Sequence, residues 1–167
     1  MSDDTLKNYK SLHGLPMLAG VADLREAAGP GLGVEECVGR LKRFHYSLQR
    51  TWRMLLSRIA AEPIYELKMG YSYHSYLVAE HITLLRDRVA ELRHPPLGLD
   101  KVPDENLERF FDEILKAPDP GHFMEGLYRV ALPALRESME RYREDTNPLT
   151  DAPGRRLLRM ILPEIED

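Results

Sequence analysis

The chain has 167 residues, 43% of them hydrophobic and 30% charged, and a formal net charge of −4. That length and composition are typical of one soluble globular domain with a hydrophobic core. A general nucleic-acid binder would normally be basic, so the acidic balance argues against nucleic acid as a partner.

No stretch approaches the roughly 18 apolar residues of a membrane span, so we expect no membrane association. The N-terminus, Met1–Asp4, is acidic and lacks the positive region of a signal peptide. Cys37 is the single cysteine, and a lone thiol that forms no internal disulfide fits a reducing compartment. We therefore expect a cytoplasmic protein in which Cys37 packs on the apolar face of a helix.

Residues 1–33 are predicted to form an N-terminal arm and linker, and residues 34–167 a single helical domain. The apolar segment Leu12–Leu18 is broken by glycine and proline, and a short helical turn is expected near Ala22–Ala27. The stretch Gly29–Gly33 could cradle a phosphate. It lacks the spacing of a dinucleotide-binding loop and no strand precedes it, so a linker is the better interpretation.

Two long helices are predicted next, over residues 34–61 and 64–93, with Glu62-Pro63 between them. Apolar positions in both recur in alternating steps of four and three residues, which is typical of helices in a bundle. The seam of the first helix consists of Val34, Val38, Leu41, His45, Leu48, Trp52, Leu55 and Ile59. The seam of the second consists of Leu67, Tyr71, His74, Val78, His81, Leu85, Arg88 and Leu92.

Three further helices are expected after the break at Pro95-Pro96. A short one spans residues 104–117 with Asp104 as its N-cap. The next spans 121–146 with Pro133 in its interior, where a proline usually kinks a helix. The last starts near Thr150 or Asp151. The chain stops at Asp167 without a capping glycine, so this helix either ends the natural protein or belongs to a longer one.

These patterns predict an all-α fold, a bundle of four main helices plus one shorter helix. The first long helix carries a basic outer face and the short helix an acidic one. Those faces are expected to be solvated, or to pair within the molecule or between subunits.

Three histidines lie on the predicted seams: His45 on the first long helix, His74 and His81 on the second. His45 and His81 are each 18 residues from Pro63, so an antiparallel hairpin places them at one level of the bundle. His74 and His81 are about 10.5 Å apart along their helix, too far to share one metal ion. His74 is expected beside Trp52.

Two imidazoles with one or two carboxylates inside a bundle suit iron, manganese or zinc. The metal ligands predicted on this basis are His45 and His81, aided by Glu80 or Glu137, with His74 and Glu164 less favoured. In the alternative, each histidine is a core polar group that bonds a carboxylate, a tyrosine or water. Tyr65, Tyr71, Tyr73 and Tyr76 are candidate tyrosine partners on the same helix.

Residues 73–93, YHSYLVAEHITLLRDRVAELR, resemble the second helix of uncharacterised bacterial ferritin-like proteins. Residues 151–166, DAPGRRLLRMILPEIE, resemble the start of their last helix. The resemblance implies a ferritin-like four-helix bundle with an extra short helix and a di-iron ancestor. The di-iron signature is Glu-x-x-His. The residues three before His45, His74 and His81 are lysine, tyrosine and valine, which implies a mononuclear, remodelled or lost site.

Two functions follow from the sequence. The first is a metal site of oxidative or metal-assisted function near His45 and His81. The second is a non-catalytic interaction or assembly module, which forms a homo-oligomer or binds a protein partner. Its partner surface is expected on the last helix or the N-terminal arm.

Overall fold

A computed structural model of the chain describes residues 22–96 and 98–166. Every regular element within these ranges is helical, which confirms the all-α prediction. The apolar arm segment Leu12–Leu18 lies outside the described residues. No helix among the described residues has both the length and the apolar character to cross a membrane.

The first described helix is the short α2 (Leu24–Ala28), which lies where a helical turn was predicted. The Asp23 side chain accepts a hydrogen bond from the Glu26 amide at 2.8 Å and so caps the first turn. Residues 29–33 then connect to the next helix without regular structure. The Asn147 side-chain amide donates to the carbonyls of Ala27 and Gly29, each at 3.0 Å, so the end of α2 and the linker are held against the loop between α7 and α8.

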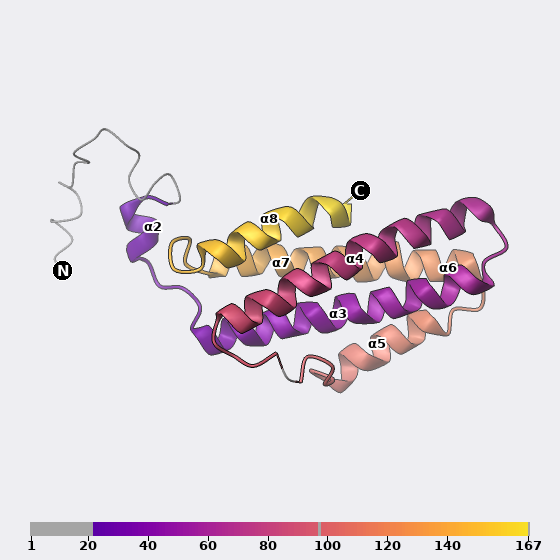
Figure 1. The fold of residues 1–167 in the computed structure, drawn as a ribbon, viewed down its shortest axis with the longest axis horizontal. Coiled ribbons are helices and arrows are strands. Elements are labelled where there is room, and N and C mark those ends of the chain that lie inside the picture. The colour runs from indigo at the N-terminus through magenta and orange to yellow at the C-terminus, as the bar shows by residue number, and fades with distance from the viewer. Residues whose placement is uncertain (1–21, 97, 167) are drawn as a thin grey trace.

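Two long helices form an antiparallel hairpin: α3 (Val34–Ala61) and α4 (Tyr65–Glu91) (Figure 1). Their bounds agree with the prediction to within two residues. Most predicted seam residues are buried, among them Leu41, Leu48 and Leu85, which are fully inaccessible. Five others are half-buried, and Val34 is 53% exposed because it lies at the first position of α3.

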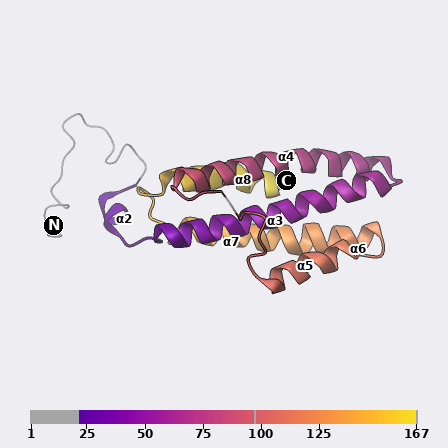
Figure 2. The ribbon, with the colours of Figure 1, turned by 60° about the horizontal axis from the view of Figure 1, so that its bottom comes forward.

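The short helix α5 (Glu105–Leu115) lies against α3 (Figure 2). Asp104 caps it as predicted, accepting from the Leu107 amide at 2.7 Å. The basic face of α3 holds this segment by ion pairs from Arg43 to Asp104 and from Arg50 to Asp112. The predicted pairing of the basic and acidic faces therefore occurs within one molecule.

The segment predicted as one helix over residues 121–146 is divided into α6 (Pro120–Met124), a π-helical η2 (Glu125–Ala131) and α7 (Leu132–Asp145). Pro133 lies in the first turn of α7, directly after the π-helical stretch. Proline has no N–H and its ring collides with the carbonyl four residues earlier, so a wider turn before it accommodates the ring. The π-helical turn was not predicted.

The last helix, α8 (Ala152–Glu166), runs beside the C-terminal half of α4 and beside α7 (Figure 1). Neighbouring helices therefore follow a closed order, with α3 next to α4, α4 next to α8, α8 next to α7, and α7 next to α3. One hydrophobic core fills the space between them. With 15 residues against 27, α8 leaves the N-terminal half of α4 to extend past its end.

Candidate functional site

The seam histidines occupy two separate environments. His74 and His81 line a small cavity between α3, α4, η2 and the end of α8, with a volume of about 60 Å³. Its other lining residues are Thr51, Leu55, Leu77, Val78, Leu127, Tyr128, Leu132, Glu164 and Ile165. His45 is not among them. We refer to this space as the histidine cavity.

His81 is paired with a carboxylate. Its Nε2 lies 2.6 Å from Oε2 of Glu164, which α8 brings to the middle of α4. The imidazole is 3% exposed, whereas the side chain of Glu164 is 48% exposed, so the pair connects the core to solvent. The Nδ1 atom of His81 is buried and has no hydrogen-bond partner among the described residues.

His74 is paired with a phenol. Its Nδ1 lies 2.7 Å from the hydroxyl of Tyr128 on η2. Burial lowers the pKa of His74 and raises that of Tyr128, because each charged form would lose its hydration. Both groups are therefore neutral near pH 7, and one donates a hydrogen bond to the other.

The tyrosines predicted as partners of the histidines do not fill that role. Tyr65, Tyr73 and Tyr76 are more than 60% exposed on the outer face of α4. Tyr71 is buried, and its ring packs edge to face on Phe123. Its hydroxyl has no hydrogen-bond partner among the described residues.

His45 is 2% exposed and lies near the segment that leads to α5. Burial lowers its pKa, and the charge of Arg86 lowers it further, while Asp100 and the Leu99 carbonyl oppose this shift. Its Nδ1 atom has no partner among the described groups. His45 and His81 are equally far from Pro63 along the chain, but His45 does not line the cavity that His81 lines.

The two predicted accessory carboxylates lie on the surface. Glu80 is exposed on α4. Glu137 forms an ion pair with Arg141 one turn along α7, and its side chain is 63% exposed. Glu164, the less favoured candidate, is the carboxylate that contacts a seam histidine.

Across residues 22–96 and 98–166, no three His, Cys, Asp or Glu side chains are grouped closely enough to hold a metal ion. The structure thus unites His81 with Glu164 and places His74 on the same cavity. It does not bring His45, Glu80 or Glu137 to them. Protein zinc sites use three or four protein ligands. A cavity of about 60 Å³ is also far below the 300–1,000 Å³ usual for small-molecule sites.

A Glu-x-x-His spacing does occur away from the seam, at Glu91–His94. The helix ends at Glu91, and Arg93 takes a left-handed conformation with φ 61°. The two side chains therefore do not lie one helical turn apart. Glu91 pairs with Arg88 at 3.0 Å, and His94 lies 3.2 Å from Glu35.

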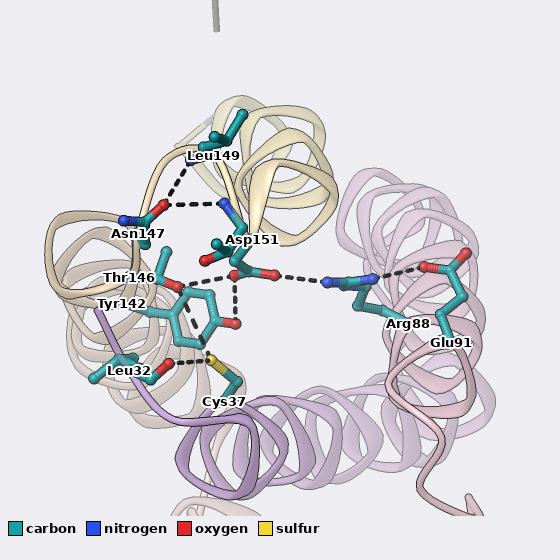
Figure 3. Close-up of polar contacts among 10 residues, drawn as sticks. Leu32, Cys37, Arg88, Glu91, Tyr142, Thr146, Asn147, Leu149 and Asp151 are labelled. Atoms are coloured by element: carbon teal, nitrogen blue, oxygen red, sulfur yellow. Dashed lines mark hydrogen bonds and ion pairs between the residues drawn. The ribbon is translucent and has the colours of Figure 1, made fainter. Parts of the chain in front are cut away.

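A buried polar network at the opposite end of the bundle was not predicted (Figure 3). Asp151 accepts from Arg88 at 2.7 Å, from the Tyr142 hydroxyl at 2.7 Å and from Thr146 at 3.2 Å. The Cys37 thiol lies 3.9 Å from Thr146, buried as expected. Burial is the main cause that raises the pKa of Tyr142, and hydrogen bonds to the Cys37 thiol and to Asp151 add to it. The signal was the presence of Arg88 on the seam, because a buried guanidinium requires a carboxylate.

Comparison of the chain with models of known protein families, with curated proteins and with solved structures found no match.

Proposed function

We propose that the chain is a cytoplasmic, ferritin-like helical-bundle module that assembles with a second copy of itself and has no catalytic role. The observation that carries this proposal is an exposed row of large side chains on α4. It consists of Tyr65, Met69, Tyr73 and Tyr76, which are 69%, 51%, 61% and 61% exposed. We call this row the α4 stripe.

The α4 stripe follows one face of the helix, since its members are separated by steps of four, four and three residues. The segment from Met69 to Ala79 contains no Asp, Glu, Lys or Arg. Tyrosine and methionine are enriched and charged residues depleted at the centres of protein interfaces. An exposed apolar surface of this kind is typical of a binding face.

The position of the stripe favours a second copy as the occupant. Glu164 reaches His81 at the middle of α4, and the stripe lies on the half of α4 that extends past α8 (Figure 1). A two-fold arrangement sets the same patch against itself. Because the middle of this patch is uncharged, two copies can meet there without opposing like charges.

The contacts of the histidines support a structural role over catalysis. His81 is bonded to Glu164 and His74 to Tyr128, as expected of core polar groups. The volume of the histidine cavity, about 60 Å³, is too small for an organic substrate.

The mass of the protein in solution tests the proposal. Sedimentation velocity at 1–100 µM is expected to give twice the chain mass of 19.2 kDa. Tyr73→Lys is expected to weaken the dimer at least tenfold, because a charge would be buried at its centre. The matched control is Val130→Lys on η2, a residue 47% exposed away from the stripe, which should leave the mass unchanged. A monomeric wild type, or equal effects of both substitutions, would contradict the proposal.

One observation favours a metal-binding function as a second candidate: the 2.6 Å contact of His81 and Glu164 beside His74. Iron, manganese or zinc would bind the His81 imidazole and the Glu164 carboxylate, because His74 lies too far along α4 to share the same ion. Metal analysis of the purified protein tests this. Stoichiometric metal that His81→Ala abolishes and His45→Ala retains would support the second candidate. Metal content below one tenth of the protein concentration would exclude it.

A further inference from the structure

A second hollow lies over the start of α8, away from the histidine cavity, and its volume is about 640 Å³. It is bounded by the C-terminal half of α4, by α8 and by Arg143 of α7. Five arginines line it: Arg88, Arg143, Arg155, Arg156 and Arg159. The two lining carboxylates are Asp87 and Glu91, so positive charge exceeds negative in a chain whose net charge is −4. We call this hollow the arginine pocket.

Four of these arginines have no carboxylate partner in the described part of the chain, whereas several arginines elsewhere do. Arg40, Arg43 and Arg50 on α3 each contact a carboxylate. Within the described ranges no ion pair joins Arg143, Arg155, Arg156 or Arg159 to any acidic group. Guanidinium groups that outnumber the carboxylates around them repel one another, and a bound anion would reduce that repulsion.

The fifth arginine is buried and fixed in place. The side chain of Arg88 is 9% exposed, and its two terminal nitrogens bind Asp151 at 2.7 Å and Glu91 at 3.0 Å (Figure 3). Its Nε is buried with no partner among the described residues, and the same holds for Nε of Arg143. The two ion pairs of Arg88 therefore give the pocket a fixed, polar wall.

Arg156 and Arg159 are the arginines best placed to bind a ligand. They lie one turn apart on α8, and the arginine pocket is the one hollow that they line among those described. Arg143 and Arg155, in contrast, also line an adjoining hollow that contains the carboxylates of Glu26, Glu140 and Glu144. Guanidinium groups bind phosphate oxygens through paired hydrogen bonds.

The rest of the lining indicates what else the ligand carries. Leu84, Leu157 and Met160 add apolar surface beside the arginines. A volume of about 640 Å³ lies within the usual range for organic ligands and well exceeds the size of a bare phosphate ion. We propose that the arginine pocket binds a small organic phosphate, with the phosphate on Arg156 and Arg159 and an apolar group against Leu157 and Met160.

Isothermal titration calorimetry of the full chain tests this inference by measuring the affinity for three probes: 1-naphthyl phosphate, inorganic phosphate and 1-naphthol. 1-Naphthyl phosphate is expected to bind at least tenfold more tightly than either fragment, and more weakly as NaCl rises from 50 to 500 mM. Arg156→Gln and Arg159→Gln should each weaken it about tenfold, because each removes charge-assisted hydrogen bonds.

The control is Arg53→Gln, an exposed arginine of α3 outside the pocket, which should bind as wild type does. Equal losses in Arg53→Gln and Arg156→Gln would reveal attraction by overall charge and would overturn the site. Absence of binding of 1-naphthyl phosphate at 1 mM would overturn it as well. Binding of inorganic phosphate as tight as that of 1-naphthyl phosphate would refute the apolar part of the proposal.

Discussion

Replacing Asp151 by asparagine should destabilise the protein by about 3–5 kcal/mol, the range measured when one partner of a buried ion pair is removed. Asp151 and Arg88 are 8% and 9% exposed, so neither charge is well hydrated. An asparagine side chain at this position keeps the shape but loses the buried charge that compensates Arg88, and it leaves Arg88 with Glu91, whose side chain is 61% exposed. Its amide nitrogen would also meet other donors, because Tyr142 and Thr146 both donate to this side chain.

The free energy of unfolding from urea titration measures the effect. For a domain of this length, 3–5 kcal/mol corresponds to a fall of about 6–20 °C in melting temperature. The matched control is Asp145→Asn, which removes the Arg40–Asp145 pair at 2.6 Å from side chains that are 31% and 48% exposed. It should cost less than about 1 kcal/mol. If Asp151→Asn also costs less than about 1 kcal/mol, the reasoning from burial is refuted.

Three further outcomes are expected. Gly154→Ala should destabilise the protein by about 1–3 kcal/mol in urea titration, because the added methyl would overlap the Asp151 carboxylate. Gly39→Ala is the control: a methyl there meets no other atom, so the substitution should stabilise the helix by about 0.5–1 kcal/mol. Burial lowers the pKa of His45, so the unfolded state binds more protons than the native state once the pH falls below the unfolded pKa of about 6.5. The free energy of unfolding is therefore expected to fall as the pH drops from 7 to 5. His45→Gln should flatten this dependence on pH, and an unchanged dependence would contradict the assignment. The Cys37 thiol is 4% exposed, so a thiol reagent should modify it only at the rate of unfolding, and rapid modification of the native protein would disagree.

The helices could be predicted from the sequence because their signals are local. The four-three spacing of apolar residues and the prolines at 63, 95 and 96 placed α3 and α4 to within two residues. The cap at Asp104 was predicted for the same reason. The π-helical turn before Pro133 was missed, because several irregular geometries relieve an interior proline and the sequence does not select among them.

The candidate site was harder to predict because it depends on the rotation and offset of packed helices. Counting from Pro63 gave the distance of His45 and His81 along the hairpin, but not which neighbours each ring faces. His45 faces the segment before α5, and His81 faces α8. The partnership of Arg88 with Asp151 joins residues 63 positions apart, which no local pattern encodes.

Because of the way α5 is attached, its local stability should depend more on salt concentration than that of the helical core. Its polar contacts with α3 are the exposed ion pair Arg43–Asp104 and the half-buried ion pair Arg50–Asp112, and only Phe111 and Ile114 of the helix are buried. Salt screens exposed pairs but leaves apolar packing intact. Rising ionic strength therefore loosens residues 104–115 before the core of α3, α4, α7 and α8, so that the amide protons of α5 exchange first.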